Sequence, residues 1–296
     1  MIVIALFGPT GVGKTAVAIA LAERLRAAGE DPVAVSADAL QLYAGLETLT
    51  GAATASERER LEHRLIGIVP VTETFSAGAY ARRAHTEIDA LIAEGRRPIV
   101  VGGTGLYLRA ALAQLDLRPP VAPATRERRA RELAARGAPA LHAQLPEHVA
   151  AGITPTDSQR VLRALELLDS GHAPPPPAGA PSQLWTAVTR HPTLLAALTM
   201  DREELAERID ARVDAMVAAG ARDEVRAAAA AGASTTARKA LGFEELLRGD
   251  VEAMKTRTRR YAKRQLTWLR KLPEVAPIDV TDRAPDDVAA EIQAMI

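Results

Sequence analysis

The segment Gly8-Pro9-Thr10-Gly11-Val12-Gly13-Lys14-Thr15 has the residue types and the spacing of a phosphate-binding loop. Its glycines allow backbone N–H groups to close around phosphate oxygens, and the N-terminus of a following helix adds a positive field. Lys14 supplies a mobile positive charge, and Thr15 supplies a hydroxyl that can bind Mg²⁺. An apolar run over residues 2–7 precedes the loop and a helical pattern follows it. The segment therefore predicts a diphosphate or polyphosphate site, but it does not identify the molecule that carries the phosphates.

Two further segments that could do chemistry follow predicted strands. Asp38 comes directly after the apolar run 33–37, and Gly102-Gly103-Thr104-Gly105 follows the run 98–101. Because ligands of parallel sheets bind beyond the carboxyl ends of the strands, both segments are expected beside the phosphate loop. Asp38 could act as a general base, bind Mg²⁺, or cap the segment after it, and its strand-end position favours a functional role. The glycine turn could bring Thr104 close to a phosphate, although such turns also occur for steric reasons.

The segment Lys255–Lys271 contains eight basic residues and no acidic one. Read as a helix, it places Arg257, Arg260, Arg264 and Lys271 along one face. A solvated helix face usually mixes both signs of charge, so the pattern indicates a surface that binds phosphates or RNA. Tyr261 and Trp268 lie between the basic residues and could stack on bases, with an anchoring role in the core favoured for Trp268.

These residues need elements that position them, and the hydropathy pattern predicts a doubly wound parallel sheet of the α/β class. Strands are predicted over 2–7, 33–37 and 98–101, with helices over about 14–28 and 77–94 between them. A returning strand is predicted over 194–198, and the remainder from Asp201 is expected to be mainly helical. An apolar stripe at helical spacing is expected to lie in the core: Leu205, Ile209, Val213, Met216 and Val217.

Residues 119–192 differ from their surroundings, since they are rich in Ala, Arg and Pro and have helical periodicity. We interpret them as an α-helical insertion domain between two parts of the core, residues 1–118 and 193–296. The stretch Pro174-Pro175-Pro176-Pro177 fits a stiff connector and equally a plain surface loop. A cluster of five arginines over 126–136 is diluted by two glutamates, so its interpretation stays open.

The composition excludes several classes of site. The formal net charge of the 296 residues is zero, so affinity for nucleic acid has to come from local patches. The absence of cysteine rules out disulfides, thiolate metal sites and a cysteine nucleophile, and the six histidines show no close pairing for zinc. No apolar run is long enough to span a membrane, and the first run reads as a buried strand without a basic leader. We therefore expect a cytoplasmic protein that does not bind membranes.

Six segments in order along the chain resemble the tRNA dimethylallyltransferase family, whose bacterial members prenylate an adenine beside the anticodon. The first three are the phosphate loop, Ser36-Ala37-Asp38-Ala39-Leu40-Gln41-Leu42-Tyr43, and Gly102-Gly103-Thr104-Gly105-Leu106-Tyr107. The others are Asp157-Ser158-Gln159-Arg160-Val161-Leu162-Arg163, Arg238-Lys239-Ala240-Leu241-Gly242-Phe243, and Ala262-Lys263-Arg264-Gln265-Leu266-Thr267-Trp268. The chain departs from the family pattern at Ala39 and Ala44 and over residues 48–53 and 63–67.

The resemblance implies a P-loop core in which the loop holds dimethylallyl diphosphate rather than ATP, with Mg²⁺ bound through Thr15. Adenine N6 would displace pyrophosphate from the allylic carbon. Asp38 would accept the proton, while Lys14, Thr104 and Arg238 would stabilise the leaving diphosphate. The anticodon stem-loop of tRNA would be the partner of a monomeric enzyme, with the base extruded from its stack. The residues implied to contact tRNA are Asp38, Ala39, Leu40, Gln41, Gln159, Arg160, Arg163, Lys263 and Arg264.

Three alternatives compete with this interpretation. A small-molecule or nucleotide kinase would use the same loop for ATP, but the basic segment 255–271 favours an RNA substrate. An isopentenyltransferase could instead act on free adenine nucleotide. An RNA-binding P-loop protein without catalysis is disfavoured, because Asp38 and Thr104 are present. The strand at 98–101 ends without an acidic residue, which argues against a motor ATPase, and no Asp-Asp-x-x-Asp motif of metal-clustering prenyl-diphosphate enzymes occurs.

Overall fold

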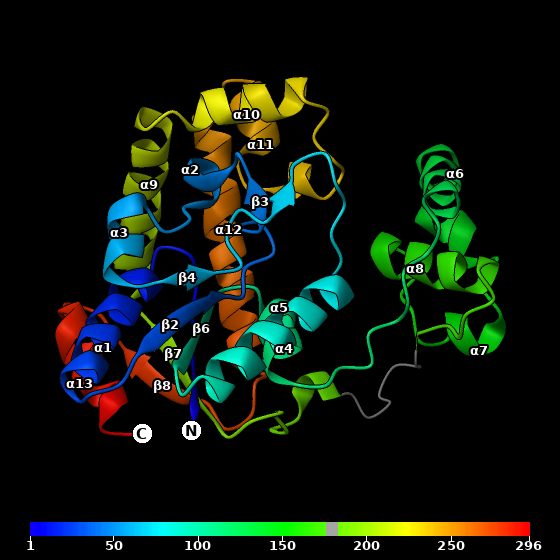
Figure 1. Cartoon of the computed structure of the whole chain (residues 1–296). Helices are drawn as coiled ribbons and strands as arrows, with labels where there is room; N and C mark the ends of the chain where they lie inside the picture. The colour runs from blue at the N-terminus through cyan, green and yellow to red at the C-terminus, as the bar shows by residue number, and fades with distance from the viewer. Residues whose placement is uncertain (176–182) are drawn as a thin grey trace. The chain divides into compact units, whose positions relative to one another are not determined.

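A six-stranded parallel sheet lies at the centre of the larger of two units in the computed structural model, which describes residues 1–175 and 183–296 (Figure 1). The strand order is β4-β2-β6-β1-β7-β8, and a second sheet contains only β3 and β5. The strands are β1 Val3–Phe7, β2 Pro32–Ser36, β3 Tyr43–Ala44, β4 His63–Arg64, β5 Val69–Pro70, β6 Arg97–Gly102, β7 Thr193–Thr199 and β8 Ala276–Asp279.

The middle of the main sheet is buried on both faces, which explains why its strands are continuous apolar runs. Ile4 of β1 pairs with Ile99 of β6 on one side and Leu194 of β7 on the other. Helices α1 (Lys14–Ala27) and α13 (Pro285–Gln293) pack together over one face, whereas α4 (Ala77–Ala93) and α5 (Gly105–Leu112) contact the strands from the other (Figure 1). All strand pairs of the sheet are parallel, so their carboxyl ends lie along the same edge.

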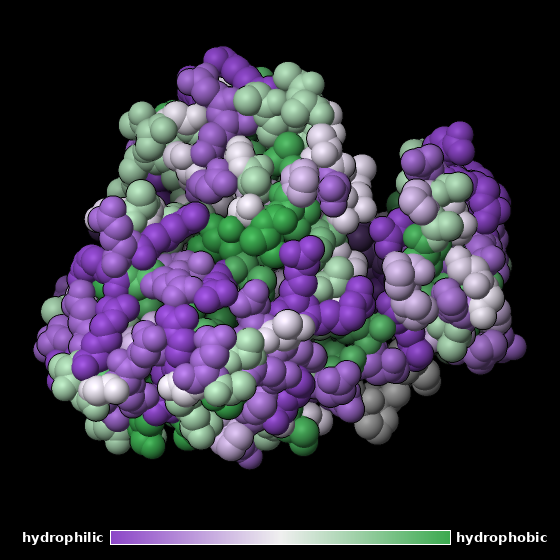
Figure 2. All heavy atoms as spheres, in the orientation of Figure 1, coloured by the Kyte–Doolittle hydropathy of each residue, from purple (hydrophilic) through white to green (hydrophobic). Residues whose placement is uncertain are grey.

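Helices make up most of the rest of the larger unit. They are α1 Lys14–Ala27, α2 Glu47–Thr50, α3 Ala55–Arg60, α4 Ala77–Ala93, α5 Gly105–Leu112, α9 Arg202–Ala218, α10 Ala221–Ala230, α11 Phe243–Leu247, α12 Val251–Leu269 and α13 Pro285–Gln293, with 3-10 turns at Gln183–Trp185 and Ala237–Lys239. The long helix α12 packs against α9, α11 and α5. Figure 2 shows that hydrophilic residues cover much of the visible face of this unit, around an area of hydrophobic residues at its centre.

The predicted α/β class and parallel sheet are confirmed, and the four predicted strands correspond to β1, β2, β6 and β7. The predicted helices at about 14–28 and 77–94 correspond to α1 and α4. The edge strands β4 and β8 escaped prediction because β4 has two residues and β8 contains a proline. Leu205, Ile209 and Val213 of the predicted helical stripe are buried in the core.

The second unit spans Asp116–Gln183 and is helical, whereas the insertion was predicted over 119–192. Its helices are α6 Pro123–His142, which Gly137 interrupts at φ +76°, α7 Glu147–Ala150 and α8 Ser158–Asp169. They enclose a small core of their own that includes Leu141 and Val161. Pro176 and Pro177, at the end of the predicted connector, lie outside the described residues. Among the residues of both units that the structure describes, no helix is long and apolar enough to cross a membrane.

Candidate active site

The phosphate loop forms the turn between β1 and α1, as its sequence predicts. Gly11 and Gly13 adopt φ values of +87° and +96°, a left-handed conformation that strains residues with a side chain. Gly8 is required for a different reason, since a Cβ there would lie 2.8 Å from the carbonyl oxygen of Leu198. Gly8 and Val12 are buried beneath the loop and do not line its cavity, although both were predicted to bind diphosphate. Their contribution is to shape the loop.

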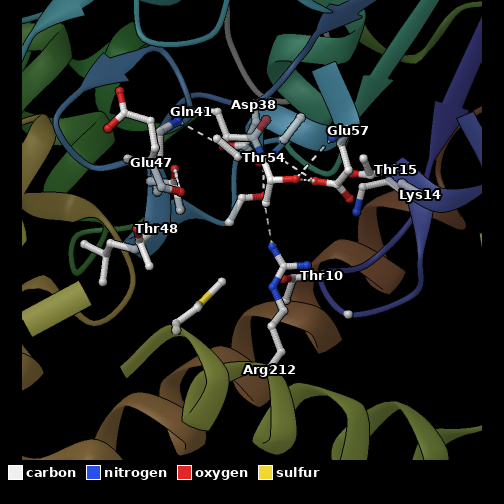
Figure 3. A pocket seen from close by; sticks show the side chains of 18 of the residues that line it. Thr10, Lys14, Thr15, Asp38, Gln41, Glu47, Thr48, Thr54, Glu57 and Arg212 are labelled. Atoms are coloured by element: carbon white, nitrogen blue, oxygen red, sulfur yellow. Dashed lines mark hydrogen bonds between the residues drawn. The ribbon is translucent and has the colours of Figure 1, made fainter. Parts of the chain in front are cut away.

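A cavity of about 970 Å³ opens beside this loop, and it brings together eight of the predicted site residues (Figure 3). Five lining residues belong to the loop: Thr10, Gly11, Gly13, Lys14 and Thr15. The lining also includes the predicted base Asp38, the predicted RNA-contacting residues Leu40 and Gln41, and Arg212. The loop follows the carboxyl end of β1 and Asp38 follows that of β2, so both lie at the same edge of the sheet. Apolar side chains from α2, α9 and α12, among them Leu49, Met216 and Met254, line another part of the wall.

Lys14 is held inside the loop by two carbonyl groups. Its Nζ donates hydrogen bonds to the carbonyl oxygens of Gly8 at 2.9 Å and Pro9 at 2.8 Å. Burial, together with the positive charge of Arg212, lowers the pKa of Lys14 from 10.5 to about 7, and the negative charge of Asp38 opposes this shift. An anion placed in the loop would favour the ammonium form and raise this pKa again.

Arg212 is the main site residue that the sequence analysis missed. It extends from α9 into the cavity, where its Nη2 donates a hydrogen bond to the carbonyl oxygen of Gly51 at 3.3 Å (Figure 3). Burial lowers the pKa of this guanidinium, whereas the carboxylates of Asp38 and Glu57 raise it. Gly51 adopts φ +57°, and a Cβ at this position would collide with the Arg212 guanidinium. A signal existed in the sequence, because Arg212 interrupts the helical stripe of apolar residues that includes Val213.

Asp38 lies at the end of β2 and lines the cavity, as predicted. Its Oδ1 accepts the backbone N–H of Leu40 at 2.9 Å, which fixes the carboxylate in a local turn. Residues 39–42 form turns rather than a helix, so the alternative of a helix cap for Asp38 is wrong. The carboxylate and the cations of Lys14 and Arg212 influence each other electrostatically within one cavity.

Gln41 has both ends of its amide engaged by the protein itself. Its Oε1 accepts the hydroxyl of Ser36 at 3.0 Å, and its Nε2 donates to the carbonyl of Gly51 at 3.2 Å. The same carbonyl receives Arg212, so two side chains hold the turn at residues 50–51. Glu224 of α10 holds the preceding turn by accepting the backbone N–H groups of Thr48 and Leu49, both at 2.8 Å. The stretch 48–53, where the chain departs from the family pattern, is thus a firmly held wall of the cavity.

Thr104 lies in a second, smaller cavity of about 160 Å³ rather than in the lining of the large one. Its Oγ1 is 3.2 Å from the hydroxyl of Tyr261. Tyr261 and Gln265 line both cavities, so the two spaces meet at these side chains of α12. Burial raises the pKa of Tyr261 to about 12, which keeps its hydroxyl protonated at neutral pH.

Arg238 does not line the cavity of the phosphate loop, contrary to its predicted place beside the leaving group. Its Nη2 forms an ion pair with Glu244 at 2.8 Å, and its guanidinium lies over the ring of Phe243 at 5.0 Å. The arginines that line the cavity are instead Arg58 of α3 and Arg208 and Arg212 of α9. The motif around Arg238 contributed to the family resemblance, but the sequence alone could not tell which arginine side chains line the cavity.

The basic run of α12 is partly neutralised by acidic residues of other helices. Lys255 and Arg259 pair with Asp214 and Asp210 of α9, and Arg257 pairs with Glu245 of α11, so the predicted basic face that includes Arg257 is wrong in part. Within the described parts of the chain, the other five basic residues are exposed and have no ion pair: Arg260, Lys263, Arg264, Arg270 and Lys271.

Two aromatic side chains of this helix are already engaged. The guanidinium of Arg264 lies 5.4 Å from the ring centre of Tyr261, and Trp268 packs against Trp185 with ring centres 4.7 Å apart. A Cβ on Gly105 would collide with the Trp268 ring, so this tryptophan packs directly against the first residue of α5. Trp268 therefore anchors α12, as favoured from the sequence.

In the second unit, Gln159 and Arg160 are exposed at the start of α8. Arg163 is tied to its own unit, because its Nη2 donates to the carbonyl oxygen of Pro119 at 2.6 Å. Arg128 and Arg129, two of the five arginines clustered over 126–136, both pair with Asp169. Among the described residues, Arg160 pairs only with Asp157 of its own first turn, at 3.6 Å, and stays exposed, whereas these other arginines hold the unit together.

The cavity also contains oxygen ligands of the kind that Mg²⁺ prefers. The structure describes no group of three or more His, Cys, Asp or Glu residues, within residues 1–175 and 183–296, that could hold a metal by itself. Thr15 and Asp38 do offer a hydroxyl and a carboxylate in the cavity. Mg²⁺ is commonly bound by one or two such groups together with substrate phosphates, so this donor set fits an ion that arrives with a diphosphate.

Comparison with known proteins identifies the relatives of this chain. The family model described as IPP transferase matches residues 41–272. A protein named tRNA dimethylallyltransferase from Thermobifida fusca (strain YX) is 42% identical, over 95% of this chain and 92% of its own length. A protein of the same name from Salinispora arenicola (strain CNS-205) is 39% identical, over 94% and 82%. The crystal structure of the full-length tRNA isopentenylpyrophosphate transferase from Bacillus halodurans aligns with a TM-score of 0.71 and 32% identity, covering 99% of this chain and 95% of that one.

Proposed function

The chain belongs to the IPP transferase family, and we propose that it transfers a dimethylallyl group from dimethylallyl diphosphate to N6 of an adenine beside the tRNA anticodon. One observation carries the proposal. Two cations, Lys14 and Arg212, share a cavity with a strand-end carboxylate, Asp38. This is the combination that a diphosphate leaving group and a nucleophile that loses a proton require.

In the proposed donor complex, the diphosphate lies on the backbone N–H groups of the phosphate loop. It takes the place of the Gly8 and Pro9 carbonyls as the partner of the Lys14 amine. Arg212 neutralises charge from the opposite wall, in the role that the sequence analysis gave to Arg238. Mg²⁺, held by Thr15 and the diphosphate, would further neutralise the leaving group. The five-carbon tail would face the apolar part of the wall.

The proposed reaction is a substitution at the allylic carbon. The lone pair of N6 forms the new N–C bond, while the C–O bond breaks and its electron pair leaves with pyrophosphate. Asp38 accepts the proton that N6 loses, because an exocyclic amine is a weak nucleophile unless a base is positioned beside it. The bond from the Leu40 N–H holds this carboxylate in place and engages Oδ1 only, as far as the described residues go.

We propose that the exposed basic residues of α12, Lys263 and Arg264 among them, contact the RNA backbone. In the second unit, Gln159 and Arg160 are the exposed candidates for RNA contact, whereas Arg163 binds the backbone of its own unit. The engaged amide of Gln41 supports a role in holding the cavity wall rather than in reading base edges. A positive surface of this kind supplies affinity that depends on salt.

The proposal is tested by offering total tRNA together with either dimethylallyl diphosphate labelled in its five-carbon group or γ-labelled ATP. Transfer of the five-carbon label to tRNA is expected, and transfer from ATP would identify a kinase instead. Asp38→Asn keeps the acceptor for the Leu40 N–H and removes the base, so turnover should fall about 10²–10⁴-fold. Asp223→Asn, at an exposed carboxylate of α10, is the matched control. Turnover of Asp38→Asn close to that of the control would exclude Asp38 as the base.

A further inference from the structure

Gln265 has a buried amide side chain, and the proposed reaction gives it no role in binding a substrate or in the chemistry. It lies on α12 and is only 4% exposed. Burying an amide is unfavourable unless its donor and acceptor groups find partners. The contacts of Gln265 are therefore informative about what the side chain holds.

The two ends of this amide join two segments that are remote from each other in sequence. Oε1 accepts the backbone N–H of Thr10 in the phosphate loop at 2.9 Å, and Nε2 donates to the carbonyl oxygen of Gly103 at 2.7 Å. A Cβ on Gly103 would collide with Nε2, so the glycine allows the amide to approach. The Gly103 carbonyl belongs to the peptide that leads into Thr104. One side chain therefore connects the loop, the turn that carries Thr104 and helix α12.

The position of Gln265 links the two cavities as well. It lines both the large cavity and the smaller one that contains Thr104. Lys263 and Arg264, which are exposed and proposed to contact RNA, lie two residues and one residue before it on the same helix. No other contact found among the described residues joins α12 to the backbone of the phosphate loop by a hydrogen bond.

We propose that Gln265 is a positioning residue that locks the phosphate loop and the Gly103–Thr104 turn onto α12 in the geometry that binds the donor diphosphate. The N–H of Thr10 points at the amide instead of the ligand, which orients the following peptides of the loop toward the cavity. Loss of the amide removes this partner from the half-buried Thr10 N–H and from the buried Gly103 carbonyl, so the loop and the turn are no longer held together. The proposal rests on the proposed function, because the ligand of the loop is taken to be that diphosphate.

The first test replaces Gln265 by Leu, which has a similar volume and no polar group. Titration with inorganic pyrophosphate and Mg²⁺ should show an affinity about tenfold lower, and kcat for transfer should fall as well. Gln293→Leu is the matched control, since Gln293 accepts a single hydrogen bond from Arg24 far from the cavity. Thermal unfolding of both variants establishes that they are folded. Pyrophosphate affinity within twofold of the wild type in folded Gln265→Leu would overturn the proposal.

The second test uses Gln265→Glu, which keeps the acceptor for Thr10 and changes the donor with pH. A protonated carboxyl group can donate to the Gly103 carbonyl as the amide does, whereas a carboxylate cannot. Pyrophosphate affinity of this variant, divided by that of the wild type at the same pH, should therefore rise as pH falls. The division removes the titration of Lys14, Tyr261 and the ligand itself. A ratio that stays flat with pH would overturn the proposal, even if Gln265→Leu fails to fold.

These measurements distinguish failure of the proposal from failure of the proposed function. Pyrophosphate binding does not need tRNA, so the Gln265 variants are informative even if the wild type transfers no prenyl group. Conversely, a wild type that prenylates tRNA, together with Gln265 variants that bind pyrophosphate normally, would support the function and reject the positioning role.

Discussion

Diphosphate binding should weaken as pH rises above neutrality, because Lys14 has to gain a proton when the ligand binds. In the empty cavity, burial and the charge of Arg212 lower the pKa of Lys14 from 10.5 to about 7. A diphosphate in the loop favours the ammonium form and returns the pKa toward its ordinary value. At every pH between the pKa of Lys14 in the empty cavity and its pKa in the complex, binding is then linked to uptake of a proton.

The size of the effect follows from the fraction of empty protein that already carries the proton. With a pKa of about 7, roughly nine-tenths of Lys14 is protonated near pH 6 and about one-tenth near pH 8. The contribution of Lys14 to affinity should therefore fall about tenfold between these two values. Stability of the empty protein should change in the opposite direction. From pH 7 to 10.5 the unfolded chain keeps the Lys14 proton that the folded protein has lost, so the free energy of unfolding rises with pH.

The assay is calorimetric titration with pyrophosphate and Mg²⁺ near pH 6, 7 and 8, in buffers of different ionisation enthalpy that report proton uptake. Lys14→Met removes the titrating group, so the ratio of wild-type to variant affinity cancels the titration of pyrophosphate. Lys255→Met is the control for loss of a lysine elsewhere, because Lys255 pairs with Asp214 and its pKa is raised. The reasoning is refuted if wild type and Lys14→Met lose affinity in parallel as pH rises.

Two other predictions concern the cavity wall and the RNA surface. Gly51→Ala should displace the Arg212 guanidinium and weaken pyrophosphate binding about tenfold or more, since charged hydrogen bonds contribute about 1.5–3 kcal/mol. Gly45→Ala has the same left-handed strain but open space around its Cβ, so a titration that finds equal losses for the two variants would contradict the role of Arg212. Lys263→Ala combined with Arg264→Ala should lower tRNA affinity and reduce the log–log salt slope by about 0.7 to 0.9 for each lost phosphate contact. Filter binding at several salt concentrations measures the slope, with circular dichroism to verify the fold, and an unchanged slope would mean that these residues are merely solvated.

The sequence by itself determined the features that depend on neighbours along the chain. The loop 8–15 forms where its glycines and flanking elements predict it, because left-handed φ values and the turn between β1 and α1 are local properties. The apolar runs became the strands of a parallel sheet. Placement of Asp38 beside the loop followed as well, since all carboxyl ends of a parallel sheet share one edge.

Only the tertiary structure decided which charged groups face the cavity and which are neutralised. Arg212 enters the cavity and binds the Gly51 carbonyl, and Arg238 pairs with Glu244, although both are arginines of predicted helical regions. The basic run of α12 looked free of acids, yet acids of α9 and α11 pair with three of its residues. Gln265 joins segments 255 and 162 residues away. Charge compensation and burial of polar groups depend on distances between packed helices, and these distances exist only once the chain has folded.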